Sequence, residues 1–446
     1  MGTRKHHRLG LWMNGLLVGH WEHAKGEDRL QYDAGWVQDA DGRPLSLSLP
    51  FTHGNAPLRG GVVTAYFDNL LPDSAQIRQR IAQRYRLSTD HPFDLLGAIG
   101  NDCVGALQIL PQGEAPANVY QIDGAPLGTA DVAQILRDTV VARPLGQRDE
   151  LSDHFRISIA GAQEKTALLW QDCHWAEPRG STPTTHIFKL PLGLVGGMQA
   201  DMRNSVENEW LCSKILQEYG IPVASCSIGT FEDQKALIVE RFDRRHMADE
   251  EGGWIARLPQ EDFCQATATP PHLKYQTEGG PGIKTIMDIL LQSANATLDR
   301  YHFFKAQVVF WLLAATDGHA KNFSLAIRAG GHYALTPLYD VLSAHPIIGT
   351  GANQIARQKA RLAMGVRGSE IHYQIDRIQR RHWFSQAQQA NLPADTVTQM
   401  LEELLASTDA VIQGVEAALP AGFPTDMAEA IFAGMRRQRD RLTATA

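Results

Sequence analysis

Apolar and polar residues follow two different patterns in the first 115 residues of the chain. Two apolar runs flank Asn14-Gly15, a pair that favours a tight β-hairpin because both residues tolerate positive φ. The stretch PLSLSLP, residues 44–50, alternates strictly and predicts a strand with one exposed face. Two helical patterns and one further strand are predicted at residues 65–85, 91–100 and 103–111. These patterns predict a small α+β domain over residues 1–115.

The remaining chain changes its periodicity twice. Residues 116–150 are rich in Pro and Gly and predict a linker that contains one helix, residues 129–141. Residues 151–245 hold several short β-like runs around one helical stretch, which predicts an antiparallel sheet with one packed helix. Over residues 246–446 apolar residues recur at i, i+3 and i+4, as they do in helices. The order predicts an α+β protein with a two-lobed, protein-kinase-like fold, namely a β-rich N-lobe and a helical C-lobe, after an extra N-terminal α+β subdomain. A nucleotide is expected in the cleft between the lobes.

Composition narrows the class of protein. The 446 residues are 43% hydrophobic and 20% charged, as in globular proteins, and their number predicts two or three domains. A net charge of −7 argues against broad electrostatic binding to nucleic acid. The five cysteines form no CxxC pair, which gives no support to a zinc or redox motif and suits a reducing compartment. No stretch approaches the roughly 18 apolar residues of a membrane span, so we expect a cytoplasmic protein.

A short polar stretch interrupts the apolar pattern at WLLAATDGHAKNFSL, residues 311–325. Its Asp317 and Asn322 have the spacing of a kinase catalytic loop, in which the acid accepts the substrate proton and the amide holds Mg²⁺. Lys321 could neutralise charge on the transferred phosphoryl group. The alternative is an ordinary turn at the end of a helix, with Lys321 in solvent.

A second acid, Asp340, follows the stretch FSLAIRAGGHYAL, which predicts a hairpin that turns at Gly330-Gly331. Kinases place another Mg²⁺ ligand after such a hairpin. The alternative is that Asp340 caps a helix that begins at DVLSA.

Upstream, Lys189 lies on the apolar run THIFKLP, where a lysine is unfavourable unless it is paired. It resembles the lysine that binds the α- and β-phosphates in kinases, with Glu207 or Glu209 as its partner. At least one of these glutamates is expected on the solvated face of its helix.

Two further segments fit the same scheme. Glu240 to Phe242 end an apolar run as a hinge between lobes would, and Asp243 is then placed to reach a ribose hydroxyl; a strand end with a charged turn is the alternative. The turn in FRISIAGAQEKTALL contains only Gly161 and fails the G-x-G-x-x-G pattern. Its small residues still allow close approach of the backbone to a phosphate.

The chain closely resembles the HipA toxin kinases of bacterial type II toxin–antitoxin modules. The resemblance extends roughly over residues 45–345. It is carried by PLSLSLP, FDNLLPDS, HPFDLLGAIG, FRISIAGAQEKTALL, TPTTHIFKLP, VERFDRR, RLPQEDFCQ, GGPGI, ATDGHAKNFS and LTPLYDVLSA.

This resemblance implies a serine/threonine protein kinase that uses ATP and Mg²⁺. Asp317 and Lys321 would be catalytic, and Asn322 and Asp340 would hold the metal. Ser158 would be an autophosphorylation site whose phosphate displaces the loop from the ATP site and inactivates the kinase. The implied ATP-binding residues are Ala160, Gly161, Ala162, Gln163, Glu164, Lys165, Lys189, Glu240, Arg241, Phe242, Asp243, His319 and Tyr339.

The resemblance also implies partners. The protein substrate would be a glutamyl-tRNA synthetase, so that translation stops and the cell becomes dormant and drug-tolerant. A HipB-like helix-turn-helix antitoxin would bind the chain and carry it to operator DNA. Contact with operator DNA is expected mainly through the antitoxin, because HWFSQAQQANLP, the corresponding helix, has no Lys or Arg. Two alternatives stay open, a self-silenced kinase fold that acts mainly as a corepressor and a small-molecule kinase.

Overall fold

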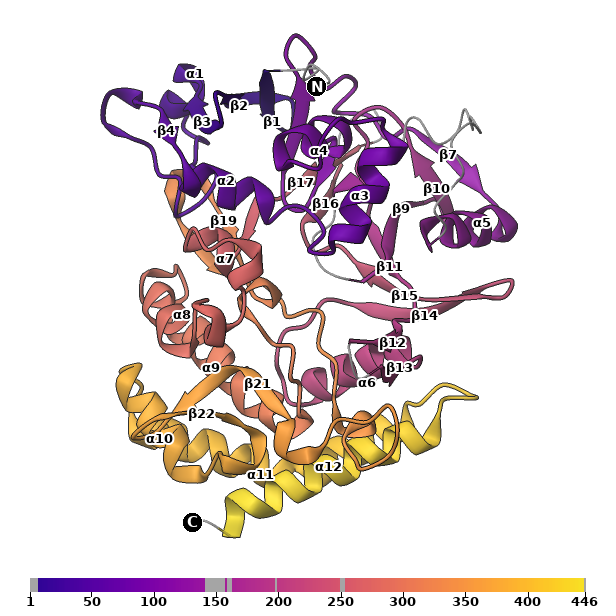
Figure 1. Ribbon diagram of the computed structural model, residues 1–446, viewed down its shortest axis with the longest axis vertical. Helices are drawn as coiled ribbons and strands as arrows, with labels where there is room; N and C mark the ends of the chain where they lie inside the picture. Colours follow the sequence, from indigo (N-terminus) through magenta and orange to yellow (C-terminus); the bar gives the residue numbers. More distant parts are fainter. Residues whose placement is uncertain (1–6, 141–156, 159–162, 197–198, 249–252, 445–446) are drawn as a thin grey trace. The chain divides into compact units, whose positions relative to one another are not determined.

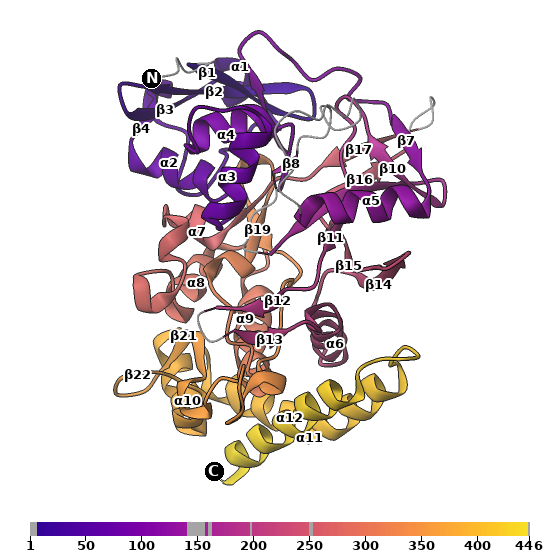
Figure 2. The same cartoon turned by 45° about the vertical axis from the view of Figure 1, so that its right-hand side comes forward.

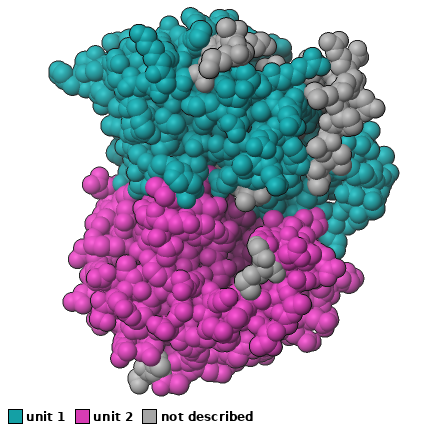
Figure 3. Space-filling model, viewed as in Figure 1, with its two compact units in different colours: residues 1–190, 229–272, 325–333 teal, residues 191–228, 273–324, 334–446 magenta. Residues whose placement is uncertain are grey.

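The computed structural model describes residues 7–140, 157–158, 163–196, 199–248 and 253–444. These residues form two compact units (Figure 3). The first unit contains residues 1–190, 229–272 and 325–333, and the second contains residues 191–228, 273–324 and 334–446. Within the described ranges, no helix is both long and apolar enough to cross a bilayer.

An antiparallel sheet in the order β4-β3-β2-β1-β6 opens the first unit (Figure 1). Asn14 and Gly15 both have positive φ between β1 and β2, which confirms the predicted hairpin. Helices α2 and α4 pack on the sheet, where the Trp21 ring stacks on Phe67 at 3.8 Å and meets the edge of Phe93. The bounds are β1 Arg8–Met13, β2 Leu16–Ala24, β3 Glu27–Tyr32, β4 Leu58–Arg59, β5 Asp102–Cys103, β6 Leu107–Pro111, α1 Ala34–Gln38, α2 Gly61–Asp68, α3 Ala75–Arg84 and α4 Pro92–Ile99.

One prediction in this region is wrong and another is wrong in part. Residues 44–50 form no strand, because the serines of the alternating pattern do not face solvent. Ser46 and Ser48 instead bond to Glu261 and to the carbonyl of Gln265. The helical pattern over residues 65–85 is split into α2 and α3, since Pro72 interrupts it and the Ser74 side chain caps the second helix.

The first unit also contains a six-stranded sheet, ordered β14-β15-β11-β9-β10-β7. Helix α5 packs against it through Val132, Ala133 and Leu136 (Figure 2). The predicted helix at residues 129–141 is thus confirmed, and it packs on this sheet. The sequence pattern instead predicted that the helix within residues 151–245 would pack there. That helix is α6, which belongs to the second unit. The bounds are β7 Gly124–Leu127, α5 Thr129–Val140, β8 Ile157–Ser158, β9 Lys165–Gln171, β10 His174–Pro178, β11 His186–Lys189, β14 Cys226–Phe231 and β15 Gln234–Glu240.

The segment after residue 243 is less helical than predicted. A hairpin of β16 and β17 and a sheet ordered β18-β19-β20 lie there. Gly330 and Gly331 have positive φ between β19 and β20, so the predicted hairpin is confirmed. The bounds are β16 Arg244–Met247, β17 Trp254–Arg257, β18 Gln260–Asp262, α7 Phe263–Ala266, β19 Ser324–Ile327 and β20 Tyr333–Leu335.

Helices dominate the second unit, with two short hairpins, β12-β13 and β21-β22. The core helix α9 buries Phe303, Phe304 and Trp311, and α11 and α12 run side by side (Figures 1 and 2). The bounds are β12 Gly193–Val195, β13 Ala200–Met202, α6 Ser205–Glu218, α8 Ile283–Ile289, α9 Ala296–Leu313, β21 Arg361–Arg367, β22 Ile371–Gln374, α10 Arg380–Gln389, α11 Ala394–Ala417 and α12 Thr425–Ala444. The domain limits at 115, 150 and 245 stay predictions.

Candidate active site

The polar stretch after α9 is a buried turn with one exposed carboxylate. Helix α9 ends at Leu313, and the next residue, Ala314, has a φ of 50° that turns the chain out of the helix. The next residues form a short 3₁₀ helix, Ala320–Asn322. His319, Lys321 and Asn322 are all buried, whereas 57% of the Asp317 side chain is exposed. Lys321 therefore does not extend into solvent, which removes the alternative of an ordinary surface turn.

Asn322 brings the two candidate acids together. Its side-chain amide donates to the carbonyl of Asp317 at 2.8 Å and to the carbonyl of Asp340 at 3.4 Å. Because the nitrogen is used in this way, the amide oxygen is the atom left for a cation. Asp340 has a φ of 61°, in the left-handed region where non-glycine residues mark special sites. Residues 341–344 are not helical, so Asp340 does not cap a helix there.

The carboxylate of Asp317 has two polar neighbours. The Tyr275 hydroxyl donates to its Oδ1, and the Nε2 atom of His319 lies 3.9 Å from the same oxygen. The Tyr275 and His319 rings meet edge to face at 5.2 Å. Tyr275 was not predicted from the sequence, because it lies 42 positions before Asp317 and has no motif spacing to it.

The Tyr339 hydroxyl makes hydrogen bonds to the polar turn that contains Lys321. It donates to the carbonyl of Lys321 at 3.0 Å and shares a hydrogen bond with the Ser324 hydroxyl. These contacts fix the backbone of the Lys321 turn. They show the predicted ATP-binding residue Tyr339 in contact with the polar turn, while contact with a nucleotide stays a prediction.

The segment that follows Asp340 is tied to α6 and to the end of α9. Asn208 of α6 exchanges two hydrogen bonds of 2.8 Å with the backbone of Ser343. The Ser343 hydroxyl in turn donates to the carbonyl of Leu313 at 2.6 Å. Both Glu207 and Glu209 of α6 are buried, so neither lies on a solvated helix face. Asn208 was not predicted from the sequence either, because its partners are backbone atoms that no pattern reveals.

The first unit holds the other predicted site residues. Lys189 lies on β11, with 5% of its surface exposed, opposite Leu237 on one side and Lys165 on the other. Glu164 forms an ion pair with Arg80, and the Gln163 amide donates to the carbonyl of Leu190. The pairing of Lys189 with a glutamate of α6 stays a prediction.

The loop residues predicted to cover the phosphates are only partly described. The backbone of Ser158 pairs in parallel with Cys103. Ala160, Gly161 and Ala162 lie outside the described residues.

The hinge segment contains a buried ionic cluster rather than an open polar site. Asp243 accepts hydrogen bonds from Arg241 at 2.8 and 3.0 Å and from the backbone of Gly105 at 2.7 Å. Burial by itself would raise the pKa of Asp243, but Arg241 and Arg244 hold it below its ordinary value. Both carboxylate oxygens are engaged and the side chain is buried, which argues against the predicted contact with a ribose hydroxyl. Glu240 is exposed and Phe242 is half-buried.

Family models match both the N-terminal and the C-terminal part of the chain, and several known proteins are related to it. A family model described as the HipA-like C-terminal domain matches residues 157–412, and one described as the HipA N-terminal domain matches residues 9–110. A Sinorhizobium fredii protein named "Putative kinase Y4mE" is 34% identical over 340 residues, which cover 75% of this chain and 77% of that protein. A Shewanella oneidensis protein named serine/threonine-protein kinase toxin HipA is 26% identical over 356 residues, or 77% of this chain and 76% of that protein.

A solved structure resembles the whole chain. The chain in the complex of the Shewanella oneidensis MR-1 toxin–antitoxin system HipA, HipB and its operator DNA has a TM-score of 0.78 at 21% identity, covering 98% of this chain and 97% of that chain. This likeness confirms the predicted α+β class, with a protein-kinase-like fold and an N-terminal subdomain. Since one HipA family model covers more than half of the sequence and the second covers its beginning, the chain belongs to the HipA family.

Proposed function

We propose that the protein is an ATP- and Mg²⁺-dependent serine/threonine protein kinase that acts as the toxin of a toxin–antitoxin module. The observation that carries the proposal is the hydrogen bonding of Asn322, whose amide joins the backbones of Asp317 and Asp340. This contact gathers an acid, an amide and a second acid in the order that phosphoryl transfer needs. The names of the relatives from Sinorhizobium fredii and Shewanella oneidensis support a kinase.

Each polar residue of the turn has a role in this reaction. Asp317, with its exposed carboxylate oriented by Tyr275, accepts the proton of the substrate hydroxyl. Lys321 stabilises the charge that develops on the transferred phosphoryl group. The Asp340 carboxylate and the amide oxygen of Asn322 suit Mg²⁺, which prefers oxygen ligands. Bound there, Mg²⁺ would neutralise negative charge on the phosphate oxygens.

In this proposal the nucleotide is held by residues that lie far apart in the sequence. Lys189 binds the α- and β-phosphates, and the backbone from Glu240 to Phe242 binds adenine. The loop from Ala160 to Lys165 covers the phosphates, and His319 and Tyr339 line the site. Autophosphorylation of Ser158 inactivates the kinase, because about two negative charges would compete with the phosphates of ATP.

The proposed substrate is a glutamyl-tRNA synthetase, whose phosphorylation halts translation. The proposed partner is a HipB-like helix-turn-helix antitoxin that carries the chain to operator DNA. Support for the partner comes from the solved complex of the Shewanella oneidensis relative, which contains HipB and operator DNA. The same support favours a second candidate function, a self-silenced kinase fold that acts mainly as a corepressor.

The test is transfer of label from γ-labelled ATP with Mg²⁺, with and without a mixture of tRNA synthetases, followed by mass spectrometry. The wild-type chain is compared with Asp317→Asn, which removes the base at constant size. Asp288→Asn is the matched control, since Asp288 is an exposed acid on α8 of the same unit that pairs with Lys284. We expect label on a synthetase serine or threonine with the wild type and the control, and none with Asp317→Asn.

Other outcomes separate the alternatives. Label on Ser158 alone favours the self-silenced corepressor. Label on a small hydroxyl compound but on no protein favours a small-molecule kinase. Equal transfer by Asp317→Asn and the wild type contradicts the proposed catalytic role of the polar turn.

A further inference from the structure

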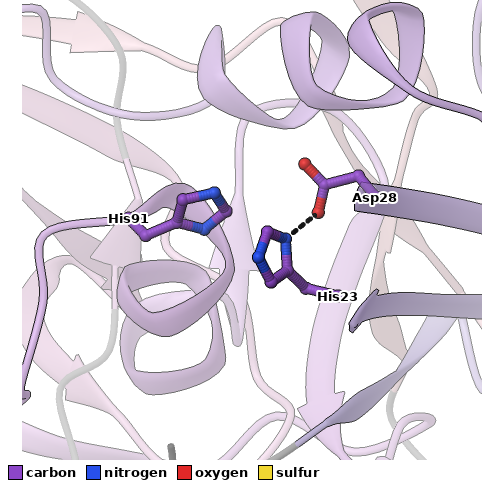
Figure 4. A group of neighbouring side chains, drawn as sticks. All are labelled: His23, Asp28 and His91. Atoms are coloured by element: carbon purple, nitrogen blue, oxygen red, sulfur yellow. Dashed lines mark hydrogen bonds and ion pairs between the residues drawn. The ribbon is translucent and has the colours of Figure 1, made fainter. Parts of the chain in front are cut away.

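Two histidines and an aspartate meet in the N-terminal sheet domain, in the same compact unit as Lys189. His23 on β2 and Asp28 on β3 are direct cross-strand partners. His91, the residue that caps the N-terminus of α4, lies beside them (Figure 4). One candidate ligand atom from each of the three side chains lies within 4.8 Å of the other two. No catalytic residue proposed above belongs to this group.

Asp28 is held in place by several donors. Its Oδ1 accepts from the Nε1 atom of Trp21 at 3.1 Å, and its Oδ2 accepts from the Thr64 hydroxyl at 2.6 Å. Only 2% of the Asp28 side chain and 11% of the His23 side chain are exposed. The carboxylate is therefore fixed in a nearly dry environment, as are the carboxylates that orient metal-binding histidines.

The hydrogen bond between His23 and Asp28 determines which nitrogen of His23 can bind a cation. The Nδ1 atom lies 2.7 Å from Asp28 Oδ1, so in the neutral ring Nδ1 carries the proton and Nε2 carries the lone pair. Figure 4 shows this second nitrogen on the side of the ring nearer to His91. The two imidazole rings are 4.3 Å apart between centroids.

A purely structural role explains only part of this arrangement. Asp28 could simply fasten His23, Trp21 and Thr64, but that role does not require a second imidazole. His91 accepts a hydrogen bond from the backbone of Phe93 at 3.2 Å, a capping contact that Ser, Thr, Asp or Asn usually supplies. A metal site would explain why a histidine occupies this cap position and why its ring lies next to that of His23.

We propose that His23, His91 and Asp28 form a binding site for one divalent transition-metal ion of the zinc class. His23 supplies its Nε2 nitrogen, His91 supplies a nitrogen in exchange for its 3.2 Å contact with the Phe93 amide, and Asp28 acts through His23 by holding its Nδ1 proton. Imidazole nitrogens select Zn²⁺, Ni²⁺ or Co²⁺ over Mg²⁺ and Ca²⁺. Water completes the coordination, because neither His23 nor His91 is fully buried. The ion would join the β2–β3 hairpin to the start of α4.

The experiment uses the full chain without a polyhistidine tag and the metals alone as probes. Zn²⁺ uptake is measured by equilibrium dialysis, and Co²⁺ binding is followed by its visible absorption. His91→Asn removes the imidazole but keeps a good helix cap, and His23→Gln removes the other ligand. His53→Asn is the matched control, since His53 is an exposed histidine of the same domain.

We expect one equivalent of Zn²⁺ per wild-type chain, a higher melting temperature with the metal, and a Co²⁺ spectrum of nitrogen and oxygen ligands. Both ligand variants should lose the binding and the thermal shift, while the control keeps them. Asp28→Asn should bind about 10- to 100-fold more weakly. An equal melting temperature of His91→Asn and the wild type without metal would show that the loss is not unfolding.

The proposal is overturned if the wild type takes up no Zn²⁺ or Co²⁺, or if His91→Asn binds as well as the wild type. A cobalt–thiolate absorption band would also overturn it, since it would assign the ion to cysteines such as the exposed Cys173. Kinase activity is not needed for any of these readouts, so failure here leaves the proposed function untouched.

Discussion

Tyr275 restrains the most exposed acid of the candidate active site. Its hydroxyl donates to the Asp317 carboxylate, and a hydrogen bond to a charged group contributes about 1.5–3 kcal/mol. If Asp317 is the catalytic base, Tyr275→Phe should lower kcat about tenfold or more, because the carboxylate then samples other orientations. KM for ATP should change little. Initial rates at saturating ATP measure both parameters.

Tyr301→Phe is the control for that prediction. The Tyr301 hydroxyl also donates to a carboxylate, that of Glu403, at 3.3 Å on the surface of the same unit. Its loss should leave kcat unchanged. A tenfold decrease in both variants would point to a general effect on the fold, and no decrease in Tyr275→Phe would show that this hydroxyl does not position the base.

Glu261 makes the stability of the first unit depend on pH. Burial raises its pKa from 4.5 to about 8, although hydrogen bonds from the Ser46 hydroxyl and the Leu47 backbone oppose the increase. The folded protein thus holds this proton more tightly than the unfolded chain. The resulting stability is full below pH 4.5 and is lost as pH rises through about 8.

We therefore expect the wild-type free energy of unfolding to fall by about 1 kcal/mol per pH unit in that window. Glu261→Gln, which cannot ionise, should show a flatter curve between pH 6 and pH 8. Urea unfolding followed by tryptophan fluorescence measures both curves. Parallel curves would show that Glu261 does not carry the pH dependence.

At the scale of elements, a buried ionic cluster joins β5 to the strands β16 and β17 and to the hinge segment. Asp102 accepts from Arg244 at 2.8 Å and from the Thr184 hydroxyl at 2.7 Å, and Arg257 lies 3.3 Å away. Burial alone would raise the pKa of Asp102, but three guanidinium groups hold it well below its ordinary value. The cluster fastens the N-terminal subdomain to the β-rich part of the same unit.

Asp102→Asn should therefore destabilise the first unit by about 3–5 kcal/mol, because it leaves buried guanidinium groups without their counter-charge. Chemical denaturation measures the loss. Asp233→Asn is the control, since Asp233 pairs with Arg137 in an exposed position and its loss should be barely measurable. A small effect of Asp102→Asn would mean that water or the neighbouring Asp243 compensates.

The sequence predicted those elements whose local pattern agrees with their burial. Helix α5, Thr129–Val140, matches the predicted residues 129–141 to within one residue, and the Asn14-Gly15 hairpin follows from backbone preference alone. Residues 44–50 misled the prediction, because alternation also arises when serines bond to a buried acid such as Glu261. Strands β21 and β22 were not predicted, because they lie within residues 246–446, where most of the apolar pattern is helical.

The candidate site was predictable to the extent that it is local in the sequence. Asp317, Asn322 and Asp340 follow from spacing, and the structure joins them through one amide. Tyr275 and Asn208 were not predictable, because their partners are distant in the sequence and, for Asn208, are backbone atoms. The ionic role of Asp243 was hidden as well, since its neighbour Gly105 lies 138 positions away.

At the scale of the whole molecule, the net charge predicts which protein contacts operator DNA if the proposed antitoxin is the partner. We expect the antitoxin, and not this chain, to supply the contacts to the phosphates. The chain has 42 basic and 49 acidic residues, so it should not shift operator DNA by itself at physiological salt. Mixed with the antitoxin, it should join the complex without steepening the salt dependence of binding. The reason is that this slope counts the phosphates neutralised, at about 0.9 per contact. Gel shifts at several salt concentrations measure the slope.

A steeper slope with the chain present would mean that its own cations reach the phosphates. The candidates are the exposed residues Arg377, which precedes α10, and Arg381, which lies in the first turn of α10. Replacing both with glutamine should then restore the slope of the antitoxin alone, whereas the same change at the exposed Arg59 of the first unit should not. If the slope steepens and neither the double replacement nor the change at Arg59 affects it, the additional contacts come from elsewhere in the complex and the charge argument fails.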